Sequence, residues 1–436
     1  MTDQPNILVL FSDQQRADSL PSYGNSFVSA PYLDRMARDG ARFSQCRTVF
    51  PVCTPARASM WTGKFPHSHG IEKNVYGVPD LLADRGLTDQ TVFALLRGAG
   101  YQCGYWGKWH LGEANPGPFD EWHAFNSWGG HWQDHRQHFQ GGTYIPDRDT
   151  DAMITWLRER ETTRPFCSVI SWYPPHDPFS CPLDTMDHYR RMGVPCPGYY
   201  GSVTALDRCV GRIMAALEET GQAGNTIVFY YSDHGETFRA RDGVTSKFVC
   251  TEDSVHVPFL MRGPGIADNL VIDELIGLQD LMPTMLDIAG VAAPADLQGR
   301  SLMPLIRGEA PDWRDIAYIE NETHNIMRDS DADPRARRRQ RAVFDGRHKL
   351  ILEDGQAILF DLAADHCAPV LGLTVAAPFL RLPQLVEEGR LEQPGGIHPA
   401  TQHGKAEHQR AAERRRPVEH AKLPIIMRGG SGTQRI

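Results

Sequence analysis

The stretch Asn6 to Gln15, NILVLFSDQQ, sets the pattern from which the fold of this chain can be predicted. Its apolar part, NILVLF, is typical of a short strand buried on both faces of a sheet, and polar side chains follow it directly. Three later apolar runs lead in the same way into GKWH, YPPHD and SDHG; they are Tyr101 to Trp106, Phe166 to Trp172 and Thr226 to Tyr231. Each predicted strand therefore carries a carboxylate, a lysine or a histidine at its carboxyl end.

Helical patterns separate these strands along the chain. In the clearest one, Val203 to Thr220, apolar side chains recur at helical spacing; they are Leu206, Val210, Met214 and Leu217. Strands that alternate with helices predict an α/β domain whose sheet is largely parallel and covered by helices on both faces. Because ligands gather at the carboxyl ends of such strands, we expect the polar residues that follow them to meet in one cleft.

The last part of the chain predicts a second, smaller unit. The run GRSLMPLIRG at residues 299–308, with Pro311, is typical of a boundary, so we expect a large domain over residues 1–312 and a small domain over 313–365. Short, turn-separated strands predict an antiparallel sheet there; they are Ala317 to Glu320, Ala342 to Phe344, Lys349 to Leu352 and Ile358 to Asp361. The polar tail over residues 366–436 has little periodicity and is expected to be poorly ordered.

Composition excludes several classes of protein. The chain has 436 residues and a net charge of −9, so it lacks the basic footprint of a nucleic-acid-binding protein. Its nine cysteines are scattered without a CxxC pair, which favours reduced thiols over a disulfide framework or a zinc ribbon. No run reaches the length of a membrane-spanning helix, and the start of the chain lacks the pattern of a signal peptide. We therefore expect a cytoplasmic protein with no membrane partner.

A cysteine lies at a predicted helix start in PVCTPARASMWTGKFPHSHG, residues 51–70. Thr54 is expected to cap this helix, and Pro55 suits its first position. Cys53 would then lie at a helix N-terminus, where free N–H groups and the helix dipole favour a bound anion. Arg57 adds a positive charge on the same turn. The alternative interpretation of Cys53 is a small buried apolar residue, which is what most free cysteines are.

The run CTPAR at residues 53–57, followed by TG at 62–63, resembles the sulfatase signature Cys-x-Pro-x-Arg, whose cysteine is converted after translation to Cα-formylglycine. Other segments also look like sulfatases of the alkaline phosphatase superfamily, over roughly residues 5 to 365; they are SDQQRADSL, GKWHLG, NTIVFYYSDHGE, SKFVCTEDSVHVPFLMRGPG and DLMPTMLDIAG. The resemblance implies a large mixed, mostly parallel sheet sandwiched by helices, with a smaller C-terminal antiparallel sheet.

The resemblance also implies a metal site. Asp13, Gln14, Asp233 and His234 match the family's metal positions, next to Cys53. Ca²⁺ is the ion that the family implies, while three oxygen donors and one imidazole also suit Mn²⁺ or Mg²⁺. Many sulfatases have aspartate where Gln14 stands and asparagine where His234 stands. The glutamine and histidine are more similar to the phosphonate monoester hydrolase branch of the superfamily.

Five further residues match catalytic positions of the family. By resemblance, Arg57, Lys108 and Lys247 hold the nucleophile and the sulfate, where they meet the charge that develops in the transition state. His110 matches a base, and His176 matches the group that contacts and protonates the leaving oxygen.

The formylglycine derived from Cys53 is expected to act as a hydrated aldehyde. One diol oxygen attacks sulfur in line, and the other later loses its proton and expels sulfate as the aldehyde forms again. A plain serine could not use that exit.

These matches predict a metal-dependent hydrolase of an organic sulfate monoester. Its partners would be a small-molecule sulfate ester and, during maturation, a formylglycine-generating enzyme; a homo-oligomer stays open. One alternative is a phosphonate monoester hydrolase or phosphodiesterase that uses the same site. Another is a catalytically inactive homologue, because the resemblance stops at Asp365, where HCAP follows. We hypothesise a change of reading frame near that codon, which translation of the other frames of the gene would test.

Overall fold

The computed structural model describes residues 4–127, 130–133, 142–240, 246–309, 312–322, 339–353 and 355–364. These residues belong to one compact unit, which spans residues 1–375. The tail expected over residues 366–436 lies outside the described residues. Among the described helices, none combines the length and the apolar character needed to cross a bilayer.

An eight-stranded mixed sheet forms the centre of the fold, in the order β5-β4-β6-β1-β7-β8-β2-β9. Strand β1 lies between β6 and β7 and runs parallel to both. Strand β8 runs antiparallel to its neighbours β7 and β2. The strands are β1 (Asn6–Asp13), β2 (Ala41–Phe43), β4 (Gln102–Lys108), β5 (Glu121–Phe125), β6 (Phe166–Pro175), β7 (Thr226–Ser232), β8 (Phe259–Arg262) and β9 (Leu270–Ile272).

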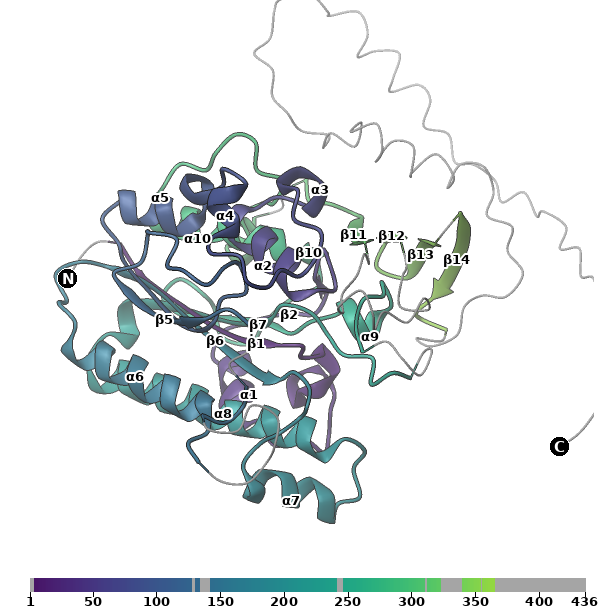
Figure 1. Ribbon diagram of the computed structural model, residues 1–436, viewed down its shortest axis with the longest axis horizontal. Coiled ribbons are helices and arrows are strands. Elements are labelled where there is room, and N and C mark those ends of the chain that lie inside the picture. Colours follow the sequence, from purple (N-terminus) through teal and green to yellow (C-terminus); the bar gives the residue numbers. More distant parts are fainter. Residues whose placement is uncertain are drawn as a thin grey trace, which may run out of the picture. The chain divides into compact units, whose positions relative to one another are not determined.

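Side chains of β1 alternate between two hydrophobic cores. Ile7, Val9 and Phe11 belong to one core, and Leu8 and Leu10 belong to the other. Both cores are covered by helices, as Figure 1 shows. One face carries α1 (Pro31–Arg38), α6 (Ile145–Glu159) and α8 (Pro197–Glu219), and the other carries α2 (Cys53–Thr62), α5 (Val92–Gly98) and α10 (Leu281–Ala289). The predicted sandwich of helices around a mostly parallel sheet is confirmed.

The long helix begins earlier than its apolar pattern indicates. Helix α8 starts at Pro197 rather than Val203, because proline supplies a suitable first turn. The four strands with polar carboxyl ends were predicted correctly. Elements with weaker apolar patterns were not predicted; they include α1, α6, α7 (Leu183–Arg191) and the two-residue strands β3 (Cys46–Arg47) and β10 (Ile276–Gly277).

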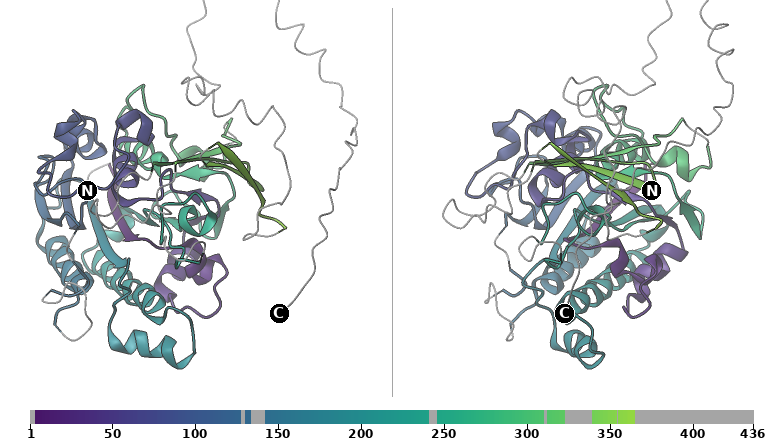
Figure 2. Two further views of the ribbon diagram at one scale, coloured as in Figure 1. Left: turned by 45° about the vertical axis from the view of Figure 1, so that its right-hand side comes forward. Right: turned by 90° about the vertical axis from the view of Figure 1, so that its right-hand side faces the viewer.

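The predicted C-terminal antiparallel sheet is confirmed and contains four strands in sequence order. Figure 2 shows them as one twisted sheet. They are β11 (Ala317–Glu322), β12 (Arg339–Phe344), β13 (His348–Glu353) and β14 (Gln356–Asp361). Apolar side chains of this sheet share a core with Cys250, Val255 and Leu275 of the large domain, so the two parts pack directly together.

A buried ion cluster also joins the small sheet to the large domain. Glu252, on the short helix α9 (Glu252–Val255), lies 2.6 Å from the guanidinium of Arg47 on β3 and pairs with Lys349 on β13. Burial raises the pKa of Glu252, but Arg47 and Lys349 outweigh burial and hold that pKa well below its ordinary value. The carboxylate therefore stabilises the fold at neutral pH.

We predict that Glu252→Gln destabilises the protein by about 3–5 kcal/mol at pH 7, because it leaves two buried cations without their shared anion. The difference should shrink as the pH falls below about 4.5, where the wild-type carboxylate loses its stabilising effect as the pH approaches its folded pKa. Urea unfolding at several pH values measures both effects. Glu309→Gln, which removes one exposed ion pair, is the control and should leave the midpoint unchanged. Equal midpoints for wild type and Glu252→Gln at pH 7 would contradict this account.

Candidate active site

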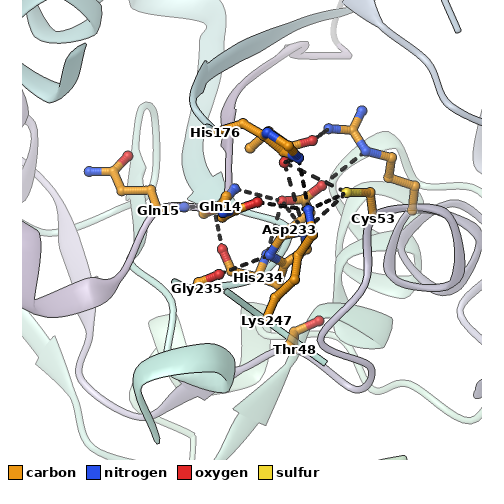
Figure 3. A network of polar contacts seen from close by, with 12 residues as sticks. Gln14, Gln15, Thr48, Cys53, His176, Asp233, His234, Gly235 and Lys247 are labelled. Carbon is orange, nitrogen blue, oxygen red and sulfur yellow. Dashed lines mark hydrogen bonds and ion pairs between the residues drawn. The ribbon is translucent and has the colours of Figure 1, made fainter. Parts of the chain in front are cut away.

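Four neighbouring strands place their carboxyl ends side by side, in the order β4-β6-β1-β7. Each of these strands has a polar residue at its end or directly after it: Lys108 for β4, His176 for β6, Asp13 for β1 and Asp233 for β7. One ligand atom from each of Asp13, Cys53, Asp233 and His234 lies within 4.8 Å of the others, and all four residues are buried. Figure 3 shows Cys53, Asp233 and His234 of this group close together. Residues far apart in the sequence therefore meet in one place, as the strand pattern predicts.

Helix α2 begins at Cys53, two residues earlier than expected, and Val52 is its N-cap. The prediction that Thr54 caps this helix and that Pro55 takes its first position is therefore wrong. The side chain of Asn74, from a separate loop, accepts a hydrogen bond from the Thr54 N–H at 3.0 Å. It therefore satisfies an N–H group that a capping side chain at the start of the helix would otherwise satisfy. All residues of α2 are buried, and the thiol of Cys53 lies at the dipole's positive end.

Arg57 connects the two aspartates at the ends of β1 and β7. Its Nη2 donates to Asp13 Oδ2 at 2.8 Å, and its Nε donates to Asp233 Oδ2 at 3.0 Å. The remaining terminal nitrogen donates to Ser171 Oγ at 2.9 Å and to the carbonyl of Lys108. The guanidinium, the two carboxylates and their surroundings are fully buried, so Arg57 fixes both carboxylates in one orientation.

The pKa values of the two aspartates shift in opposite directions. Burial raises the pKa of Asp13, but Lys108, His176 and Arg57 outweigh it, and the resulting pKa is well below the ordinary value. The Lys108 ammonium lies 2.6 Å from Asp13 Oδ2. For Asp233, burial and the charge of Asp13 together raise the pKa. Two carboxylates this close and this buried favour a positive charge between them.

His234 presents an unprotonated nitrogen to the same point. Its Nδ1 lies 3.0 Å from the Gly235 carbonyl, which can only accept, so Nδ1 carries the proton. The lone pair of Nε2 then lies 3.1 Å from the Cys53 sulfur and 3.7 Å from the Oδ1 atoms of both Asp13 and Asp233. Two carboxylates and one imidazole nitrogen that converge beside Cys53 form a ligand set that fits a divalent cation.

Gln14 lies beside this group. Its backbone adopts a left-handed conformation (φ 69°), and its N–H donates to Asp233 Oδ1 at 3.1 Å. Its side-chain Oε1 accepts from Lys247 Nζ at 2.7 Å, and its Nε2 donates to Glu236. Glu236 was not predicted as a site residue, although it follows His234 by two positions in SDHGE.

Two lysines flank the thiol of Cys53. Lys247 Nζ lies 3.3 Å and Lys108 Nζ lies 3.5 Å from its sulfur. Burial raises the pKa of this thiol, but the positive charges of Lys108 and Lys247 outweigh burial and hold the pKa well below its ordinary value. Position 53 is therefore surrounded by positive charge that stabilises an anion.

His176 faces the site from the loop after β6. Its Nε2 lies 2.8 Å from Lys247 Nζ, and its Nδ1 lies 2.9 Å from Asp177 Oδ1. Burial and Lys247 lower the pKa of His176, whereas Asp177 and Asp13 outweigh them and raise the pKa to about 9. Asp177 was not predicted, because its role depends on the direction of the His176 ring rather than on a sequence pattern.

His110 differs from His176 in its acidity. Its ring is buried, and neither ring nitrogen makes a hydrogen bond of ordinary geometry within the described part of the chain. Burial and the neighbouring Lys108 lower the pKa of His110 to about 4. At neutral pH its imidazole is therefore uncharged and able to accept a proton. The structure thus brings all ten predicted site residues into one connected region.

Comparison with known proteins gives consistent matches. The sulfatase family model matches residues 5–291, and the model described as "N-sulphoglucosamine sulphohydrolase, C-terminal" matches residues 242–366. An ulvan-active sulfatase from Formosa agariphila is 30% identical over 355 residues, which cover 73% of this chain and 68% of the relative.

Solved structures share the fold. The structure of BT4656 in complex with its substrate D-glucosamine-2-N,6-O-disulfate aligns with a TM-score of 0.72 at 23% identity, covering 89% of this chain and 98% of the other. The phosphonate monoester hydrolase of Agrobacterium radiobacter aligns with a TM-score of 0.69 at 20% identity, covering 89% and 95%. Family matches that span most of the large domain, together with the fold, show that this chain belongs to the sulfatase family of sulfuric ester hydrolases.

Proposed function

We propose that this enzyme hydrolyses an organic sulfate monoester with a formylglycine at position 53 and one divalent metal ion. A formylglycine-generating enzyme would oxidise Cys53 during maturation. The observation that carries this proposal is the convergence of Asp13, Asp233 and His234 beside Cys53, at the start of a buried helix.

Asp13, Gln14, Asp233 and His234 would hold the metal, through three oxygen atoms and one imidazole nitrogen. When bound, the ion polarises a nonbridging oxygen of the ester and lowers the pKa of a hydroxyl at position 53. We propose Ca²⁺ from the family, with Mn²⁺ as the stronger alternative to Mg²⁺ because of the imidazole ligand.

The two lysines beside position 53 would bind the sulfate group. Lys108, at the end of β4, and Lys247, in a loop, both approach the Cys53 sulfur. Both ammonium groups can therefore donate to oxygens of an anion bound at position 53. The donors of Arg57 are already taken by Asp13 and Asp233, so we propose that it supports the sulfate mainly by fixing these carboxylates. Its predicted direct contact with the nucleophile stays a prediction.

Two histidines with opposite protonation would move the protons. The pKa of His176 is raised to about 9, which suits a group that donates a proton near neutral pH. Its Nε2 accepts from Lys247 Nζ at 2.8 Å in the free site, and it would carry its proton once an ester oxygen takes the place of that contact. His176 would protonate the leaving oxygen. His110 is neutral and would take a proton from the hydroxyl at position 53.

A phosphonate monoester hydrolase is the second candidate. Gln14 and His234 motivate it, because they resemble the metal ligands of that branch. An inactive homologue has less support, since every predicted site residue is present and lies in the connected region.

We also propose a reducing, cytoplasmic location, which the free thiols of the eight cysteines within the described residues support.

Replacement of Cys53 by alanine should abolish turnover, because the nucleophile derives from that side chain. Metal binding should largely persist, since the remaining ligands are unchanged. Turnover of an aryl sulfate and calorimetric titration with Mn²⁺ measure the two effects. Cys181→Ala, which removes another buried thiol, is the matched control and should retain activity. Near-normal rates for Cys53→Ala would contradict the mechanism.

Mass spectrometry of the tryptic peptide over residues 48–57, after coexpression with a formylglycine-generating enzyme, should show the oxidised side chain.

An aryl sulfate should react faster than an aryl phosphonate monoester with the same leaving group. Matching the leaving group makes the comparison report on the group that is transferred. Values of kcat/KM for both esters, measured with Ca²⁺ and with Mn²⁺, give the answer. A strong preference for the phosphonate under both metals would replace the sulfatase proposal by its alternative.

His176→Ala should slow esters with poor leaving groups more than esters with good ones. Alkyl sulfates need a proton on the departing oxygen, so their kcat should fall by about 10²–10⁴-fold, whereas a nitrophenyl sulfate should lose much less. A series of sulfate esters with graded leaving-group pKa measures the slope of log kcat. The same loss for every ester would assign His176 to binding rather than to proton donation.

A further inference from the structure

We propose that Glu236 is a positioning residue that selects which end of the Gln14 amide faces the metal site. This inference rests on the proposed function, because it assumes that Gln14 is a metal ligand. Glu236 is fully buried and touches the Gln14 side chain directly.

The two partners of the Gln14 amide require the same orientation. Lys247 Nζ lies 2.7 Å from Oε1, and an ammonium can only donate. The Glu236 carboxylate contacts Nε2, and a carboxylate can only accept. Oε1 is therefore held toward Lys247, whose Nζ also contacts Cys53, while Nε2 is held toward Glu236. Figure 3 shows Gln14, Lys247 and Cys53 in the same network of contacts.

A glutamine ligand needs such a device, whereas an aspartate ligand does not. Rotating the amide by half a turn exchanges its oxygen and nitrogen with little change in shape. The flipped amide would turn its NH₂ group toward the Lys247 ammonium and its oxygen toward the Glu236 carboxylate, so both contacts would be lost and the end that faces position 53 could not ligate a cation. Both ends of a carboxylate are oxygen, so an acidic side chain at position 14 would have no wrong orientation.

Glu236 is itself held rigidly. Its Oε1 accepts the N–H of Phe238 at 2.6 Å, and its own N–H donates to the Asp253 carbonyl at 2.8 Å. The preceding residue must be glycine, because a Cβ on Gly235 would lie 2.2 Å from the same Asp253 carbonyl oxygen. The close approach of these two backbones fixes the direction from which the carboxylate reaches Gln14.

Glu236 also supplies negative charge that the ligand set lacks. Asp13 and Asp233 are the two anionic members of the proposed set, and Gln14 and His234 are neutral. The carboxylate of Glu236 lies just behind Gln14, so it adds a third negative charge within the buried region without contacting the metal.

Metal affinity tests the inference without any need for turnover. Apoprotein prepared with EDTA is titrated calorimetrically with Mn²⁺ and, separately, with Ca²⁺. Glu236→Gln should raise Kd by about 10- to 100-fold, the usual effect of losing a group that orients a ligand. Glu218→Gln makes the same chemical change on the exposed face of α8 and should leave Kd unchanged.

Exchange of the two side chains separates positioning from a merely structural role. A glutamate at position 14 has no wrong orientation, so in the Gln14→Glu background Glu236→Gln should no longer weaken binding. The double variant Gln14→Glu/Glu236→Gln should therefore bind Mn²⁺ about as tightly as Gln14→Glu and at least about 10-fold more tightly than Glu236→Gln. General damage to the fold would instead make the double variant the weakest.

Each outcome has a defined meaning. Unchanged affinity in Glu236→Gln, or an equal loss of affinity from Glu236→Gln in the Gln14→Glu background, overturns this inference. Asp13→Asn tests the metal site itself. If wild type binds no Mn²⁺ or Ca²⁺, or if Asp13→Asn binds as tightly as wild type, the metal site of the proposed function is wrong and this inference falls with it. If Asp13→Asn loses binding while Glu236→Gln keeps it, only the role of Glu236 is wrong.

Discussion

The guanidinium of Arg57 between Asp13 and Asp233 is the interaction on which the site depends. Strands β1 and β7 are neighbours, so their parallel geometry forces the two carboxylates together in a region without solvent. Their mutual repulsion would be costly if no buried cation paired with both. Because Arg57 lies one turn after Cys53 on α2, the same helix that joins the carboxylates also fixes the reactive position beside them. Strand pairing and helix packing thus set the geometry of the chemistry.

Three carboxylates and three cations of the site are buried together, and His176 beside them adds further positive charge when it is protonated. The carboxylates are those of Asp13, Asp233 and Glu236, and the cations are Arg57, Lys108 and Lys247. A divalent cation would therefore leave an excess of positive charge in a region of low dielectric constant. That excess attracts an anionic ester and strengthens its contacts with Lys108 and Lys247. The proposed metal would thus prepare the site for its substrate by charge as well as by coordination.

Local patterns were sufficient to predict the strands and the polar residues that follow them, because a buried strand needs a continuous apolar run and ends where polarity returns. Contacts between distant segments could not be predicted in this way. Asn74 replaces the expected cap Thr54, since a loop remote in sequence reaches the helix N-terminus. Glu236 and Asp177 act through the direction of a neighbouring side chain, and a single sequence carries no signal for that direction. The resemblance to sulfatases supplied the site residues, but not the partners that orient them.

Charge alone does not distinguish a sulfate monoester from a phosphonate monoester, because each carries one negative charge. The number of nonbridging oxygens does distinguish them, since the sulfate has three and the phosphonate has two, with carbon in the third place. The proposed metal, Lys108 and Lys247 offer three separate positive partners around position 53. A sulfate can satisfy all three, whereas a phosphonate would place its carbon substituent against one of these cations and leave that cation without an oxygen partner. The buried lysines therefore favour sulfate transfer, even though Gln14 and His234 resemble the phosphonate branch.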